Sequence, residues 1–142
     1  MVKTITARGI GQPDWYRSVQ STRPKLSPGQ SRGYWTASGN ILANSYSIID
    51  VGTVPSGEQW VIGFVSVSCS KSGINLIILT TDEFGFDYEF FGSYYDVNLQ
   101  VPFSTLGAFP VGSGGTLKVH LYNYLPETAY FRVAVHYTVN KV

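Results

Sequence analysis

The residues most capable of chemistry are two histidines, one cysteine and a group of acidic side chains. His120 and His136 fall on the outward phase of the last two expected strands, and in a paired register they would lie close enough to share a metal ion. The sequence suggests no third ligand beside them, and it places no nucleophile within reach of a base. We interpret both histidines as surface residues and expect no metal site.

Cys69 ends an expected strand, and the turn that follows it carries a cation, Lys71. No partner set marks the thiol as catalytic, so we interpret it as buried or half-buried. A single cysteine also excludes an intrachain disulfide and a multi-cysteine metal cluster. The phosphate-binding, dinucleotide-binding and HExxH or CxxC metal motifs do not occur. The sequence therefore predicts a non-enzymatic protein without a cofactor.

Five acidic residues gather between positions 82 and 96: Asp82, Glu83, Asp87, Glu89 and Asp96. Their spacing does not match the 12-residue calcium loop, and strand alternation would spread the carboxylates along one face. A solvated acidic face is the simpler interpretation. The alternative is that Asp87 and Glu89 receive a basic segment.

Such a segment exists at the start of the chain. Residues 1–35 hold six bases and one acid, for a net charge of +5, whereas the other residues hold four bases and eight acids, for −4. The six bases are Lys3, Arg8, Arg17, Arg23, Lys25 and Arg32. Opposite charges on the two parts indicate a role in recognising partners.

Residues 1–35 show no period of 2 or 3.6, and proline and glycine interrupt them, so we expect an extended N-terminal arm. Ordering such an arm costs about 1–2 kcal/mol per residue, while one buried Trp or Tyr returns roughly 4–6 kcal/mol. Contacts with a second surface must supply the remaining free energy needed to order the arm. The candidate partner-binding residues are Trp15, Tyr16, Arg17, Arg23, Lys25 and Arg32, whereas Tyr34 and Trp35 are expected to pin the arm's root. Six bases are few for a segment that binds nucleic acid, and the acidic body would repel a phosphate backbone. We therefore expect no nucleic-acid partner.

Residues 36–142 are expected to form one all-β domain, since aromatic residues make up 15% of the chain and charged residues only 13%. Strand-length runs alternate with turns every 8–12 positions. Residues 74–81 (INLIILTT) are apolar on both faces and predict a central strand, and residues 84–90 alternate aromatic with acidic. Residues 125–128 (LPET) are expected to join the last two strands as a hairpin. Seven or eight strands favour an antiparallel jelly-roll sandwich, with a Greek-key barrel as the alternative.

The chain combines a β body, a polar arm that bears aromatic residues, the lack of a catalytic constellation and the turn VPSGEQW (residues 54–60). In this combination it resembles the decoration, or cement, proteins of long-tailed Thermus phages. The resemblance implies a jelly-roll homotrimer that sits on the outside of the capsid, binds the major capsid protein and stabilises the shell. It further implies arms that contact neighbouring subunits, with repeated weak contacts adding by multivalency. The sparse charge departs from the usual thermophilic pattern.

The location implied by the resemblance is the capsid exterior, after synthesis in the host cytoplasm. No apolar run has the length of a secretory signal or of a membrane span, so no membrane partner is expected. The alternative function is a carbohydrate- or receptor-binding jelly-roll module of a phage tail or fibre, in which residues 84–96 (FGFDYEFFGSYYD) supply aromatic platforms.

Overall fold

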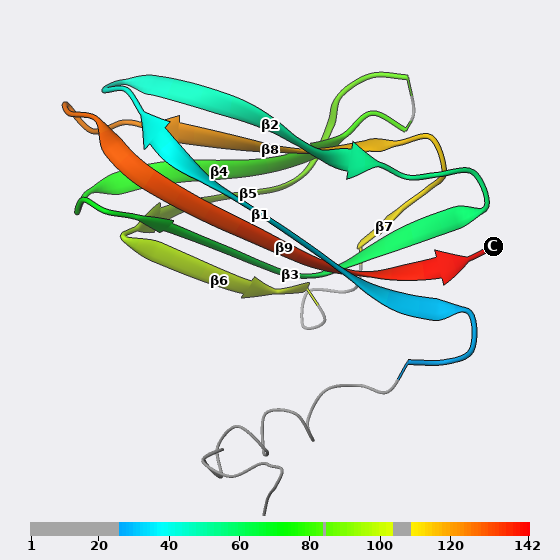
Figure 1. The fold of residues 1–142 in the computed structure, drawn as a ribbon. Helices are drawn as coiled ribbons and strands as arrows, with labels where there is room; N and C mark the ends of the chain where they lie inside the picture. The colour runs from blue at the N-terminus through cyan, green and yellow to red at the C-terminus, as the bar shows by residue number, and fades with distance from the viewer. Residues whose placement is uncertain (1–25, 84, 104–108) are drawn as a thin grey trace, which may run out of the picture.

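The structure, a computed structural model, describes residues 26–83, 85–103 and 109–142 (Figure 1). In these residues nine strands follow one another along the chain. They are β1 (Gln30–Ile41), β2 (Ser45–Thr53), β3 (Glu58–Cys69), β4 (Ile74–Thr81), β5 (Tyr88–Asp96), β6 (Asn98–Pro102), β7 (Phe109–Val111), β8 (Thr116–Asn123) and β9 (Ala129–Lys141).

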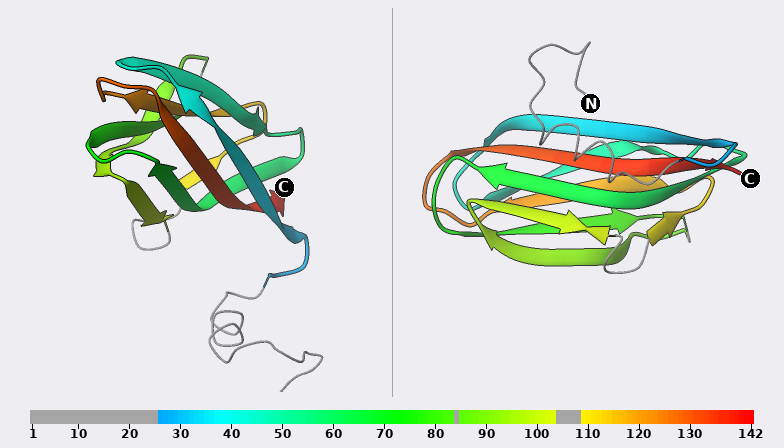
Figure 2. Two further views of the ribbon diagram at one scale, coloured as in Figure 1. Left: turned by 60° about the vertical axis from the view of Figure 1, so that its left-hand side comes forward. Right: turned by 90° about the horizontal axis from the view of Figure 1, so that it is seen from below.

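The strands form two antiparallel sheets that pack as layers (Figure 2). One sheet runs β1-β9-β3, with β6 and β7 both pairing with β3, and the other runs β5-β4-β8-β2. A single pair, Asp96 with Asn98, connects the two sheets through a turn in which Val97 has a φ of 65°. This order is that of a jelly-roll sandwich, so the predicted fold class is confirmed.

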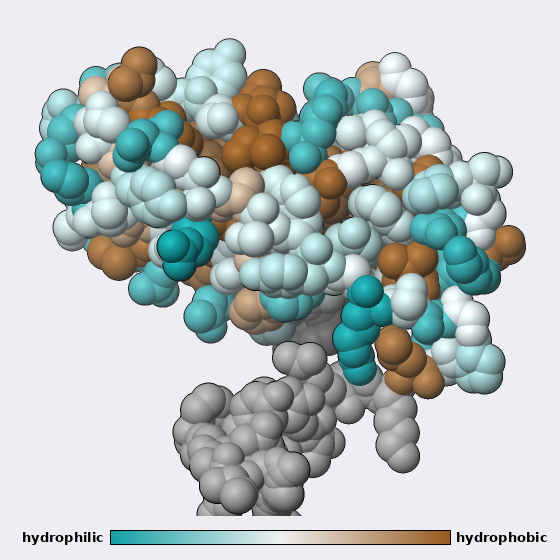
Figure 3. Space-filling model, viewed as in Figure 1, coloured by the Kyte–Doolittle hydropathy of each residue, from teal (hydrophilic) through white to brown (hydrophobic). Residues whose placement is uncertain are grey.

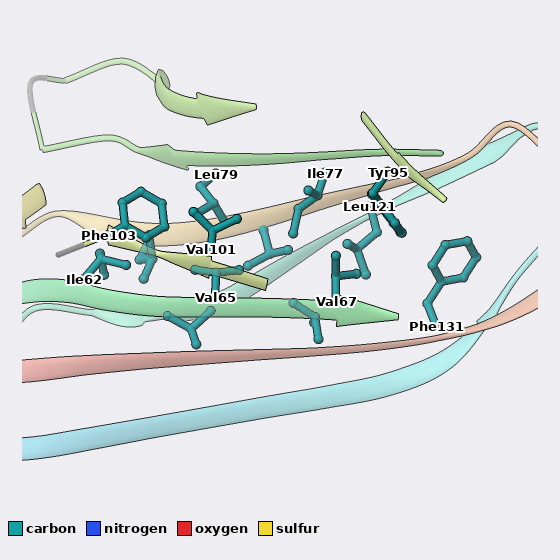
Figure 4. Close-up of a cluster of buried hydrophobic side chains, with 14 of the residues drawn as sticks. Ile62, Val65, Val67, Ile77, Leu79, Tyr95, Val101, Phe103, Leu121 and Phe131 are labelled. Atoms are coloured by element: carbon teal, nitrogen blue, oxygen red, sulfur yellow. The ribbon is translucent and has the colours of Figure 1, made fainter. Parts of the chain in front are cut away.

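The core lies between the two sheets and is built from alternate residues of the strands. Figure 4 shows Val65 and Val67 of β3 facing Ile77 and Leu79 of β4 and Leu121 of β8, and each of these is at most 2% exposed. Burial of each such side chain contributes about 1.5–3 kcal/mol. The inward phase predicted for the last two strands is confirmed, as is the central position of residues 74–81, because β4 lies between β5 and β8.

Residues 30–35, which the sequence pattern placed in the arm, belong instead to β1. Twelve residue pairs join β1 to β9, so the strand is defined by distant backbone partners rather than by its own alternation. A turn from Ser27 to Gln30 starts it, with Gly29 at a φ of 82°. The side-chain amide of Gln30 also donates to Oδ1 of Asn140 over 2.8 Å.

The expected hairpin between the last two strands is wrong. Strand β8 pairs with β2 and β4, whereas β9 pairs with β1 and β3, so the connection crosses from one sheet to the other. Buried Asn123 organises this crossing, because its amide contacts the carbonyl oxygens of Ile41, Leu42 and Glu127 at 2.9–3.1 Å.

The aromatic alternation expected for residues 84–90 is also broken. The chain turns from Asp82 to Gly85, and β5 begins at Tyr88, which leaves Phe86 62% exposed. A bulge at Phe90 then brings this side chain against the core, next to Phe91. Phe84 lies outside the described residues. Within the described residues there is no helix that is long and apolar enough to cross a membrane.

Candidate interaction surface

The two histidines lie on different sheets and do not form a site. His120 on β8 has Nε2 2.9 Å from the Thr80 hydroxyl, and burial lowers its pKa, although nearby Asp87 and Glu89 oppose this shift. His136 on β9 contacts the rings of Tyr34 and Phe64. Within the described residues no three His, Cys, Asp or Glu side chains gather as metal ligands do. Cys69 is buried at the end of β3.

Three of the five acidic residues hold loops in place. Asp82 accepts the Thr116 amide over 2.6 Å, Glu83 accepts the Gly112 amide over 2.7 Å, and Asp96 accepts the Gly73 amide over 2.9 Å. Carboxylates engaged this way are spread along the strand ends and do not converge on one point.

Asp87 and Glu89 remain exposed at the start of β5. Asp87 lies 3.3 Å from the Nζ of Lys118, which is itself partly buried on β8. The acidic face therefore contains a cation of its own, and Glu89 carries the less compensated charge of the two carboxylates.

The candidate arm residues fall mostly outside the described part of the chain: Trp15, Tyr16, Arg17, Arg23 and Lys25. Arg32 is exposed on β1. Tyr34 is 61% exposed and lies against the ring of His136, with centroids 4.6 Å apart. Trp35 points the other way and packs against the core.

A surface that the sequence reading did not single out lies on the outer face of the sheet β5-β4-β8-β2. The strand registers place Tyr46, Tyr122, Leu76 and Tyr94 side by side across all four strands. Ile48, His120 and Ile78 form the next row, followed by a polar row of Asp50, Lys118, Thr80 and Glu89.

We define the tyrosine face by the apolar and aromatic members of this surface: Tyr46, Ile48, Ile74, Leu76, Ile78, Tyr94, Tyr122 and Tyr124. The ring of Tyr122 lies 5.4 Å from that of Tyr46 and 5.8 Å from that of Tyr124, measured between centroids. Figure 3, viewed from the side of β1 and β9, shows hydrophobic residues (brown) at the surface near β2, among paler neighbours.

The tyrosine face is large enough to indicate interaction. Tyr46, Tyr94 and Tyr124 are 60%, 65% and 48% exposed, and Ile48 and Ile74 are 50% and 57% exposed. At about 200 Å² per tyrosine side chain, the three tyrosines alone expose roughly 350 Å². Patches of about 300–600 Å² are the largest on typical monomers and are often functional.

The outer face of the other sheet has a different character. Its outward positions on β1, β3, β6 and β9 are mostly polar: Thr36, Ser38, Asn40, Ser66, Ser68, Asn98, Gln100, Arg132 and Thr138. Tyr34, Phe64 and His136 form one aromatic strip across it. One outer face thus suits water, while the other suits a partner.

The sequence contained a signal for the tyrosine face. Tyr46, Ile48 and Asp50 alternate in SYSIID, as do Tyr122 and Tyr124 in LYNY, so an exposed aromatic phase was readable. What the sequence could not provide was the strand order, which brings β2 and β8 together.

No family model matches the chain, and no curated protein matches it in sequence. Among solved structures, PirA has a TM-score of 0.50 at 9% identity, covering 71% of this chain and 93% of that one. The Yersinia pseudotuberculosis-derived mitogen has a TM-score of 0.49 at 15% identity, covering 74% and 86%. A chain in the acid-stable capsid of Helicobacter pylori bacteriophage KHP30 has a TM-score of 0.46 at 12% identity, covering 80% and 98%. Identities this low reflect likeness of fold alone.

Proposed function

We propose that this chain is a non-enzymatic structural protein of a virion, which binds the outside of the capsid as a homotrimer and stabilises the shell. The observation that carries the proposal is the contrast between the two outer faces, one with three exposed tyrosines and two exposed isoleucines and the other mostly polar, with Tyr34 and Tyr130 as its exposed tyrosines. Burying about 350 Å² of tyrosine surface returns roughly 9 kcal/mol before the costs of association. A rigid sandwich with one such face suits docking on a second copy of the chain, and the resulting trimer is proposed to bind the major capsid protein.

The proposed role of residues 1–25 is to tether neighbouring subunits. Their bases complement the acidic end of the tyrosine face, where Asp87 and Glu89 remain the proposed receivers. A deletion that tests the tether should stop at residue 25, because removal of residues 30–33 would cut into β1.

The test is cosedimentation of the purified chain with capsids from which it has been stripped, together with its native mass. We expect saturable binding to the capsid and a mass of three chains. Weaker binding is expected after deletion of residues 1–25, which leaves all nine strands intact. A monomer that does not sediment with shells would contradict the proposal.

A second candidate function, carbohydrate binding, is favoured by the same row of exposed tyrosines. Aromatic rings on a flat sheet present apolar faces flanked by the carboxylates and imidazole of Glu89, Asp50 and His120, which could bind hydroxyl groups. Glycan-array binding by a monomer, lost on changing Tyr46 and Tyr94 to serine, would favour this function over the structural role.

A further inference from the structure

The gap between β1 and β2 is a second feature without an assigned role. Within the described residues these strands end the two sheets, β1 pairing with β9 and β2 with β8, so each has one edge without a strand beside it. Free edges are sites at which another chain can add a strand. The two edges therefore leave backbone groups available on one side of the sandwich.

A hollow of about 110 Å³ opens between these edges. Its apolar lining comes from Ala37, Ile41, Ile49, Leu121 and Phe131, and Ser38, Asn40 and Ser47 also line it. Cavities of comparable size hold one small apolar group. The hollow therefore has room for one aliphatic side chain.

Gly39 lies in the wall of this hollow, and a Cβ added there would meet no atom within 4 Å. The backbone of Gly39 is not in the left-handed region, so a larger residue would be tolerated. The missing side chain keeps the hollow open, and it gives a means of closing it by mutation.

The N-terminal segment contains a short run suited to pairing at such an edge. Residues 2–6 read VKTIT, which is the densest β-branched stretch before Leu26 and carries Ile5 as its fourth residue. Residues 7–25 would span about 60 Å when extended, enough to reach another subunit.

The start of β1 argues against a tight hairpin between β1 and residues 26–29. The Ser27 amide donates to the Gln30 side chain over 2.7 Å, and not to a partner across a hairpin ladder. Residues 26–29 also lie at the end of β1 farthest from Gly39 (Figure 1).

We propose that residues 2–6 of a second copy add as a strand at the β1 edge and place Ile5 in the hollow at Gly39. This inference rests on the proposed tethering function and adds a site for residues 2–6, while Asp87 and Glu89 remain the proposed receivers of the basic side chains. The added strand would use free backbone groups of β1 and cover apolar side chains between the sheets.

Disulfide trapping in the full-length chain tests the proposal. The variant Ile5→Cys with Gly39→Cys is oxidised in its oligomeric state, and covalently linked chains are expected on a non-reducing gel. The matched control, Ile5→Cys with Gly63→Cys, puts the second thiol at an exposed glycine of β3, which also has room for a Cβ. It should link chains several-fold less. Cys69 is buried and should not participate.

A crosslink within one chain would overturn the second-copy assignment, and equal crosslinking at Gly63 would overturn the site. A further measurement uses Gly39→Leu, which fills the hollow. Amide exchange at residues 2–6 should become several-fold faster in this variant, and unchanged exchange would contradict the proposal. Native mass measured on the same samples tests the trimer separately. A trimer without the crosslink would exclude the hollow as the binding site, whereas a monomer would contradict the proposed function.

Discussion

The side-chain amide of Asn123, buried at the end of β8, donates to the Ile41 carbonyl oxygen over 2.9 Å and so joins the two sheets. The same side chain accepts the Leu125 amide through Oδ1, also over 2.9 Å. Asn123→Ala would leave several buried backbone groups without partners, so we expect a loss of about 2–4 kcal/mol in the free energy of unfolding. Urea denaturation monitored by tryptophan fluorescence measures it.

The control for this prediction is Asn40→Ala. Asn40 is exposed on β1, so its replacement should change the free energy of unfolding by no more than about 0.5 kcal/mol. Equal effects of the two substitutions would contradict the role assigned to Asn123.

Two glycines of β1 should respond oppositely to the same substitution. A Cβ at Gly33 would lie 2.1 Å from the Tyr137 ring, which stacks on Trp60 with centroids 4.5 Å apart, whereas a Cβ at Gly39 meets nothing. We expect Gly33→Ala to cost about 1–3 kcal/mol through overpacking, and Gly39→Ala to be neutral or stabilising by up to about 1 kcal/mol. Thermal unfolding of the two variants compares them directly. A neutral Gly33→Ala would argue against residues 30–35 lying in the sheet.

The fold class was predictable from sequence because alternation along β8 and β9 identifies strands and their inner faces without tertiary information. Pairing was not predictable. The prediction of a β8–β9 hairpin failed because Asn123 binds the carbonyl groups of Ile41 and Leu42, which are distant in the sequence, a contact that local sequence does not encode. The start of β1 was missed for the same reason, since its partner is β9. Predicting the tyrosine face would have required the β2–β8 register and the β4–β8 register together.

The imidazole of His120 should make stability depend on pH. Burial lowers its pKa in the folded state below the usual value near 6.5, so the unfolded chain binds the proton more readily. The contribution to stability is complete above about pH 6.5 and is lost as the pH falls toward the folded-state pKa. His120→Gln should reduce this slope in denaturation curves between pH 7 and pH 5. His136→Gln serves as the comparison and should leave the His120 contribution in place.

The proposed acidic receiver predicts a salt-dependent loss of assembly. Asp87→Asn with Glu89→Gln removes two exposed carboxylates at the end of the tyrosine face, and native mass should show fewer trimers at low salt. The difference should shrink as the salt is raised, because screening weakens exposed charge pairs. Glu127→Gln removes a carboxylate paired with Lys71 elsewhere on the surface and should not alter the mass. A double variant that assembles like the parent at low salt would exclude this receiver.

The tyrosine face itself predicts the largest effect on assembly with little effect on folding. Tyr46 and Tyr94 are 60% and 65% exposed, so Tyr46→Ser with Tyr94→Ser removes partner-facing surface while the core is retained. Losing roughly 250 Å² of that surface corresponds to about 6 kcal/mol before compensating terms, which should convert the oligomer to monomer at micromolar concentration. Sedimentation velocity measures the change. Tyr34→Ser is the matched control, because Tyr34 is 61% exposed on the opposite outer face. If the control dissociated the oligomer and the double variant did not, the interface would lie on the β1-β9-β3 sheet instead.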